Sequence, residues 1–143
     1  MQKIKIKTVI GRTEKVDFPE LSLFNIPAKI DTGAYTSSLH CHDIREEHKV
    51  LHFKLVDSSH KEYNYKDHQF TEYFQKKIKN SFGEMEVRYT IKTLVRIGNK
   101  RIRTKITLSD RGSMKYPVLI GRSLLRNHFI VDVGLTDHLS YKM

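Results

Sequence analysis

The carboxylate of Asp31 lies in a sequence context that could support catalysis. Asp31 follows the apolar residue Ile30 and precedes Thr32, Gly33 and Ala34. Gly33 has no Cβ, so a turn here can take unusual dihedral angles and admit a second backbone. Thr32 adds a hydroxyl, and Ala34 leaves room. Two aspartates about 3 Å apart share one proton, so one serves as an acid while the other activates water. The predicted chemistry is hydrolysis of a peptide bond.

The chain supplies only half of such a pair. Asp-Thr-Gly occurs once, at residues 31–33. We therefore expect a homodimer in which each copy contributes Asp31, and a dyad that titrates as a unit. The Thr32 hydroxyl is placed to hydrogen-bond across the two-fold axis. Water attacks the carbonyl directly in this scheme, so we expect no cofactor and no metal ion.

Alternation of apolar and polar residues dominates the chain and predicts strands. We expect strands over residues 3–10, 26–31, 50–57, 87–97, 102–108 and 129–133, turns at 58–61 and 80–83, and a polar loop over 109–115. Gly98-Asn99 is a two-residue hairpin signal. One short helix is expected at 121–126. The sequence thus predicts one all-β domain over residues 1–143, with a single short helix near the C-terminus.

The chain is strongly basic, with a formal net charge of +10 over 143 residues. Such a surplus attracts polyanions, either nucleic acid or an acidic polypeptide. The cations are dispersed, however: Arg101, Arg103 and Lys105 alternate with less polar residues, as on the solvated face of a sheet. That solvated face is the favoured interpretation, and an acidic ligand is the alternative.

A cytoplasmic location is expected from three observations. No apolar run approaches the roughly 20 residues that a membrane helix needs. The first residues alternate in charge and lack the apolar block of a signal peptide. Cys41 is the only cysteine, so no internal disulfide can form. We expect no membrane partner.

Three segments, 26–40, 76–108 and 116–133, resemble a retropepsin, the single-domain peptidase of retroviruses. The resemblance implies a closed barrel of six to seven strands, a flap that covers the cleft, and an apolar-apolar-Gly element that buttresses the catalytic turn. The flap and substrate-contacting residues are then Asn80, Ser81, Phe82 and Gly83, and the buttress is Leu119, Ile120, Gly121 and Arg122.

A closer resemblance covers nearly the whole chain. Asp31–Ala34, Ser81–Gly83, Thr107–Arg111, Met114 and Tyr116–Arg122 are similar to a bacterial retropepsin-like family that carries an inherited label of ATP-dependent zinc proteases. Its members often accompany ATP-grasp glutamate ligases. The chain has neither a Gly-x-x-x-x-Gly-Lys-Ser/Thr nucleotide loop nor a His-Glu-x-x-His zinc helix, so its sequence does not support that label.

Two features depart from these families. Retroviral enzymes commonly place an aspartate after the alanine of the turn, where it pairs with the arginine equivalent to Arg122, and the bacterial relatives usually have arginine there. This chain has Tyr35, so Arg122 needs another partner or binds substrate. The stretch 43–75 is also longer than a retroviral chain provides.

Other residues could support different chemistry. His40 and His42 flank Cys41, and alternate strand positions would let both imidazoles bind one ion, but the sequence offers no obvious further ligands. Cys41 lacks a well-placed base to act as a nucleophile. Asp132-Val133-Gly134 superficially resembles a second catalytic turn, and we interpret it as an ordinary strand end. Aromatic residues within 63–79 could stack on bases, although core and flap-base packing is favoured.

The favoured function is that of an aspartic endopeptidase acting on peptides, with acidic or glutamylated peptides as the suggested substrates. The basic charge and the family's association with glutamate ligases suggest this class. Two alternatives remain open at this point: a retropepsin-shaped dimer that binds peptides without cutting them, and a basic β-barrel that binds nucleic acid.

Overall fold

The structure is a computed structural model that describes residues 6–55, 66–79, 81–110 and 115–139. Within those ranges no helix has the length and apolar character needed to cross a membrane. Strands dominate, accompanied by one 3₁₀ turn, η1 (Pro19–Leu21), and one α-helix, α1 (Arg122–Leu125). The predicted turn at 58–61 lies outside the described residues, as do most of the residues predicted to form the loop at 109–115.

Six strands form a closed mixed barrel. Their order is β10–β4–β11–β3–β2–β9, and β9 pairs with β10 to close the ring. The strands are β2 (Thr13–Phe18), β3 (Leu23–Ile30), β4 (Ser37–His40), β9 (Met85–Ile97), β10 (Lys100–Ser109) and β11 (Val118–Ile120). The all-β closed barrel with one short C-terminal helix, predicted from the sequence, is confirmed.

The longest pairing follows directly from the sequence pattern. β9 and β10 run antiparallel from Ile97↔Lys100 to Tyr89↔Leu108, joined by the two residues Gly98 and Asn99. Gly98 has φ +59°, a conformation that glycine adopts without strain. Along β10 the side chains at 101, 103 and 105 are exposed, so this part of the basic surplus does form a solvated face.

The barrel interior is apolar. Fully buried side chains come from every strand of the ring, among them Val16, Ile26, Leu39, Ile91, Ile106 and Val118. Leu124 and Leu125 of α1 join the same core, which fixes the helix against the barrel. This rigid body positions the loops at its edge.

β2 was not predicted because a carboxylate interrupts its apolar face. Val16 and Phe18 are buried on that face, and Glu14 is buried with them. Burying a carboxylate costs free energy unless hydrogen bonds replace water. Glu14 accepts backbone N–H bonds from Gly11 at 2.8 Å, His138 at 3.1 Å and Leu139 at 3.0 Å, which supply that replacement.

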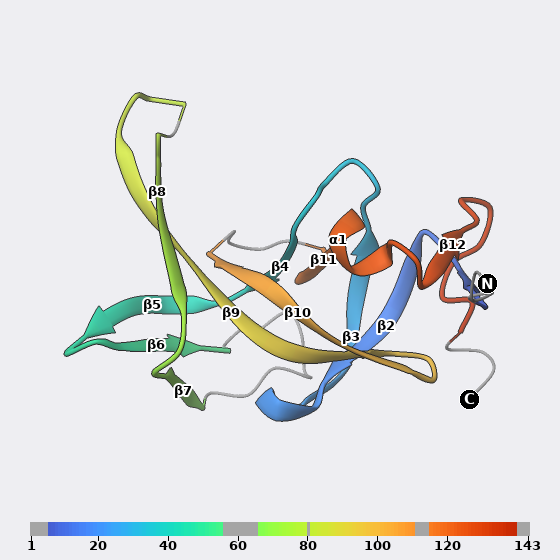
Figure 1. Cartoon of the computed structure of the whole chain (residues 1–143), viewed down its shortest axis with the longest axis horizontal. Helices are drawn as coiled ribbons and strands as arrows, with labels where there is room; N and C mark the ends of the chain where they lie inside the picture. Colours follow the sequence, from blue (N-terminus) through green and yellow to red (C-terminus); the bar gives the residue numbers. More distant parts are fainter. Residues whose placement is uncertain (1–5, 56–65, 80, 111–114, 140–143) are drawn as a thin grey trace, which may run out of the picture.

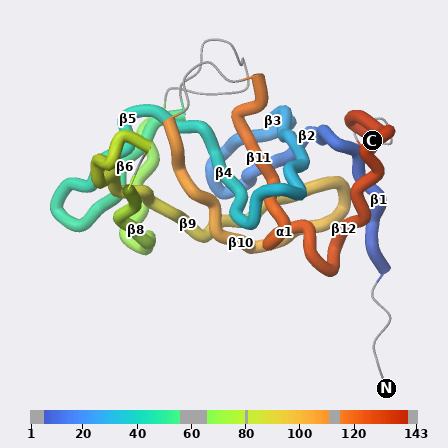
Figure 2. The backbone as a smooth tube through the Cα atoms, turned by 90° about the horizontal axis from the view of Figure 1, so that it is seen from above, coloured from blue at the N-terminus to red at the C-terminus, as the bar shows by residue number. Residues whose placement is uncertain are grey.

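Two smaller sheets lie at opposite ends of the molecule (Figure 1, Figure 2). At one end, β5 (His42–Glu47), β6 (Val50–Lys54) and β7 (Asp67–Phe70) form a three-stranded antiparallel sheet. At the other, β1 (Thr8–Ile10) and β12 (Phe129–Val131) form a parallel ribbon. The three-stranded sheet contains much of the long 43–75 stretch noted in the sequence.

Candidate active site

Asp31 begins the loop that joins β3 to β4. Its backbone N–H donates to the Ile120 carbonyl at 2.8 Å, so the turn starts where β3 lies beside β11. The Gly33 N–H donates to Asp31 Oδ1 at 3.0 Å, and the Ala34 N–H donates to the Asp31 carbonyl at 3.2 Å. The carboxylate is therefore held by its own turn, which leaves Oδ2 for other partners.

The Leu119–Arg122 segment lies directly against this turn. β11 pairs in parallel with β3, and Gly121 passes so close to the loop that a Cβ there would come within 2.5 Å of the Thr36 carbonyl oxygen. Only glycine fits this approach. The Gly121 N–H donates to the buried Ser37 Oγ at 2.9 Å, and the N–H groups of Arg122 and Ser123 donate to Ala34 and Tyr35 carbonyls.

Arg122 finds a partner in the turn itself. Its Nη1 donates to the Thr32 carbonyl at 3.0 Å, and its guanidinium carbon lies 5.8 Å from the centre of the Tyr35 ring. A cation over an aromatic face is attracted by the ring quadrupole. Arg122 is thus held by the Thr32 carbonyl and the Tyr35 ring, both in the turn loop. Thr32 itself is exposed, and its bond across a two-fold axis stays a prediction.

A long hairpin projects from the barrel on the same side as the loop between β3 and β4 (Figure 1). It consists of β8 (Phe74–Lys79) and the first part of β9, paired from Phe74↔Thr90 to Lys79↔Met85. Its tip holds three of the predicted flap residues: Ser81, Phe82, whose side chain is 88% exposed, and Gly83, with φ +80°. Asn80 lies outside the described residues. We call residues 74–90 the flap hairpin.

A cleft of about 780 Å³ separates the flap hairpin from the barrel. The turn loop contributes Ala34 and Thr36 to its wall, and β4 contributes Ser38. Residues 107–110 come from the end of β10 and the residue that follows it. The flap side contributes Lys76, Ile78, Glu86, Val87, Arg88, Tyr89 and Thr90. The cleft thus lies between the loop that follows Asp31 and the flap hairpin.

The three-stranded sheet supports the base of the flap hairpin. The Tyr73 hydroxyl donates to Glu46 of β5, and this hydrogen bond raises the pKa of Tyr73 to about 12. Gln75 Nε2 donates to the same carboxylate at 3.4 Å. Phe70 and Tyr73 pack against the core, in agreement with the favoured interpretation of these aromatic residues.

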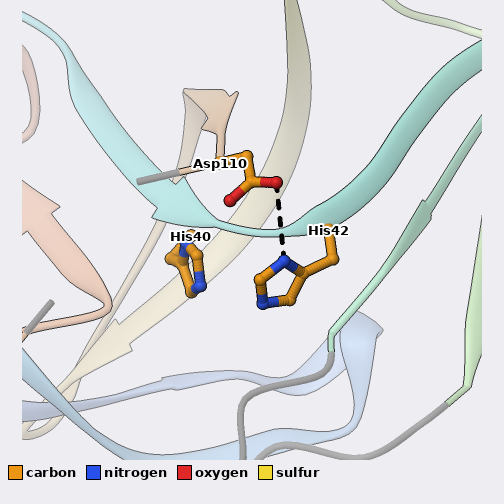
Figure 3. A group of neighbouring side chains, drawn as sticks. All are labelled: His40, His42 and Asp110. Atoms are coloured by element: carbon orange, nitrogen blue, oxygen red, sulfur yellow. Dashed lines mark ion pairs between the residues drawn. The ribbon is translucent and has the colours of Figure 1, made fainter. Parts of the chain in front are cut away.

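The His40–Asp43 segment lies where β4 ends and β5 begins. The imidazoles of His40 and His42 are neighbours, with ring centres 4.6 Å apart. The structure brings a third group to them, Asp110 (Figure 3), which the sequence analysis did not connect with the pair. Cys41 is fully buried, and burial raises the pKa of its thiol well above the ordinary value, with a further contribution from the Asp110 charge. A protonated thiol is a poor nucleophile.

Comparisons with known proteins identify the family of the chain. The profile of the family described as "RimB-like: Retropepsin-like aspartic endopeptidase RimB" matches residues 9–139. Two curated relatives, from Shewanella pealeana and Desulfotalea psychrophila, are each named probable alpha-L-glutamate ligase. The first is 34% identical, with 88% of this chain and 28% of that protein aligned. The second is 32% identical, with 90% and 29% aligned. The chain thus spans under a third of either relative.

A solved structure has the same fold. The crystal structure of a protein of unknown function from Legionella pneumophila superposes with a TM-score of 0.73 and 27% sequence identity. The alignment covers 94% of this chain and 99% of that one. The overall fold described above is therefore shared with a distinct protein.

Proposed function

Because the chain belongs to the RimB-like family of retropepsin-like aspartic endopeptidases, we propose that it hydrolyses peptide bonds with a pair of Asp31 carboxylates, one from each subunit of a homodimer. The observation that carries the proposal is the Asp31 turn, which β11 braces and whose loop contributes Ala34 and Thr36 to the cleft beneath the flap hairpin. Gly33 holds Oδ1, so Oδ2 is the oxygen available to a partner or to water.

Exposed apolar side chains on the described surface support a dimer. In the β1–β12 ribbon, the register partners Val9 and Ile130 are 40% and 53% exposed. Tyr35, on the turn loop, is 63% exposed, and Phe82 at the flap tip is 88% exposed. We infer that a second copy covers these residues, since aromatic and apolar side chains are enriched where subunits meet. A dimer would also bring the second carboxylate, which the single Asp-Thr-Gly requires.

In the proposed mechanism, the two carboxylates hold one proton between them because both cannot ionise so close together. The ionised Asp31 takes a proton from water, and the resulting nucleophile attacks the peptide carbonyl. The protonated Asp31 of the other subunit donates to the leaving nitrogen. No covalent intermediate forms, and the Thr32 hydroxyls bridge the two turns.

Acidic peptides are the proposed substrate class. Lys76 lies in the cleft wall, and Lys77 and Lys79 are exposed on the same flap strand. The net charge of +10 would attract an acidic chain from a distance. The curated relatives are named for glutamate ligation, so a glutamate-rich polypeptide is the natural candidate.

Asp31→Asn tests the chemistry. It keeps the size of the side chain and removes its acid–base function, so we expect cleavage to fall by about 10²–10⁴-fold. Sedimentation equilibrium should show that the variant still dimerises. Unchanged cleavage by Asp31→Asn would remove Asp31 from the mechanism.

The substrate class is tested separately, with the wild-type chain. Matched peptides rich in glutamate or in glutamine are compared at low and at high salt. We expect faster cleavage of the acidic peptide at low salt and a smaller difference at high salt, because ions screen the attraction. Equal rates at low salt would refute the acidic class and leave the dyad untouched.

A further inference from the structure

Three segments meet at one end of the cleft wall. His40 is the last residue of β4, His42 is the first of β5, and Asp110 directly follows β10. β4 pairs in parallel with β10, with His40 opposite Ser109. The Cys41 N–H donates to the Ser109 carbonyl at 3.0 Å. The backbone ladder therefore brings both histidines beside Asp110 without any contribution from the side chains themselves.

The side chains of this cluster are close enough to share an ion (Figure 3). One ligand atom from each of His40, His42 and Asp110 lies within 4.8 Å of the other two. His42 Nδ1 is 3.5 Å from Asp110 Oδ2. Around a tetrahedral zinc ion with bonds of about 2.0–2.2 Å, neighbouring ligand atoms lie about 3.3–3.6 Å apart. The His42–Asp110 edge already has that length. The two edges to His40 are at most 4.8 Å, so ion binding would draw His40 closer to the other two ligands.

The surroundings suit a bound cation. His40 is 1% exposed, so its imidazole is held in place and shielded from water. His42 and Asp110 have side-chain exposures of 36% and 55%, which leaves an open approach. Lys54 pairs with His42 across the β5–β6 ladder. Its Nζ lies 3.7 Å from Asp43 Oδ2, so this ammonium group has an acidic partner outside the cluster. Within the described ranges no other three histidine, cysteine or acidic side chains meet this way.

We propose that His40, His42 and Asp110 form a binding site for a divalent transition-metal ion, with Zn²⁺ as the best chemical match. Two imidazoles and one carboxylate are ligands that zinc accepts, and three protein ligands leave a fourth position for water or a ligand group. The ion would tie the β4–β5 junction to the end of β10. Because Asp110 and Ser109 line the cleft, it would fix the shape of the cleft wall away from Asp31.

The test uses Zn²⁺ alone, added to chain that carries no histidine tag and has been stripped with a chelator. Calorimetry against a competing chelator gives stoichiometry and affinity, and thermal melts with and without Zn²⁺ report stabilisation. We expect one ion per chain and a rise in Tm. His42→Gln and Asp110→Asn should each weaken affinity at least about tenfold, since losing even an outer-shell partner has that effect.

A matched control comes from the neighbouring sheet. His52 Nδ1 lies 3.4 Å from Asp67 Oδ2, the same kind of histidine–carboxylate pair without a third ligand. His52→Gln should therefore bind Zn²⁺ like the wild type, as should Asp31→Asn. Wild-type chain that shows no stoichiometric binding would overturn the proposal, and so would equal binding by His42→Gln and His52→Gln. None of these outcomes depends on peptide cleavage.

Discussion

Among the described residues, two Asp-x-Gly turns, at Asp31 and at Asp132, make the same set of backbone hydrogen bonds. In each, the aspartate N–H donates to the carbonyl of a strand residue: Asp31 to Ile120 at 2.8 Å, and Asp132 to Ile10 at 2.9 Å. In each, the glycine N–H donates to the aspartate Oδ1, at 3.0 Å for Gly33 and at 2.9 Å for Gly134.

The elements that brace the two turns also correspond. A Cβ added at Gly121 would lie 2.5 Å from a carbonyl oxygen of the first loop. A Cβ added at Gly11 would lie 2.6 Å from the Leu135 carbonyl oxygen of the second. Each glycine is followed by an arginine whose N–H donates to the braced loop. The Asp-x-Gly hydrogen bonds are therefore a structural device that the fold uses twice.

The surroundings are where the two turns differ. The Gly121 N–H is satisfied by the Ser37 hydroxyl, whereas the Gly11 N–H is satisfied by the buried Glu14 carboxylate. Glu14 also accepts hydrogen bonds from the N–H groups of residues 138 and 139, which ties the segment after the second turn to β2. The cleft and flap hairpin adjoin only the first turn, which supplies Ala34 to the cleft wall. The comparison teaches that the neighbourhood, and not the turn, distinguishes the candidate catalytic aspartate.

The largest expected effect is the contrast between the two aspartates. Asp31→Asn should reduce peptide cleavage by about 10²–10⁴-fold, and Asp132→Asn should leave it within about twofold of wild type, because no residue of the Asp132 turn lines the cleft beneath the flap hairpin. Steady-state cleavage by both variants, purified in parallel, checks this. A comparable loss in Asp132→Asn would mean that the second turn takes part in the reaction.

Next in size are the two bracing glycines. Gly121→Ala and Gly11→Ala each push a methyl group against a backbone carbonyl, so both should lower the free energy of unfolding by about 3 kcal/mol. Urea denaturation measures the loss. Cleavage per folded molecule should fall only in Gly121→Ala, because that methyl group displaces Thr36 in the loop that carries Asp31. Equal cleavage by the two variants would show that the position of Gly121 does not affect the active site.

A smaller effect is expected at the groups that satisfy the glycine N–H. Glu14→Gln leaves an amide NH₂ facing backbone donors in a buried site, which should cost about 2 kcal/mol of unfolding free energy. Ser37→Ala removes a single neutral acceptor and should cost about 1 kcal/mol. Chemical denaturation of the two variants checks the order. The reverse order would show that Glu14 is not the stronger support.

The smallest effect is expected at Tyr35. Tyr35→Ala removes the ring beside Arg122 and should lower the unfolding free energy by about 0.5–1 kcal/mol, the range for an exposed cation–π contact. Tyr35→Phe keeps the ring face and serves as the matched control, with stability near that of wild type. A large loss of unfolding free energy in Tyr35→Phe would show that the hydroxyl, and not the ring, makes the stabilising contact.

The parts that could be predicted from the sequence are those with local signals. The β9–β10 hairpin follows from alternation and Gly98-Asn99. The position of Asp31 after an apolar strand and the Gly121 motif indicate the turn and its brace, because both need small residues at fixed places. The retropepsin-like barrel itself was predicted by resemblance and is confirmed.

The parts that could not be predicted depend on contacts between distant segments. Glu14 interrupts the apolar pattern of β2, so the strand has no clear signal in the sequence. The burial of Glu14 depends on backbone N–H donors from the distant residues 138 and 139. β4 and β5 are short and polar, and their apolar patterns are weak. Asp110 joins His40 and His42 through the parallel β4–β10 register, which no local pattern encodes.

The most direct test of the central claim is a subunit-mixing measurement. Wild-type and Asp31→Asn chains are mixed in equal amounts, allowed to exchange, and assayed for peptide cleavage at constant total concentration. If each site needs an Asp31 from both chains, only wild-type pairs are active, and random pairing predicts about one quarter of the wild-type rate. A rate of about one half would mean that each chain works alone, and would contradict the shared dyad.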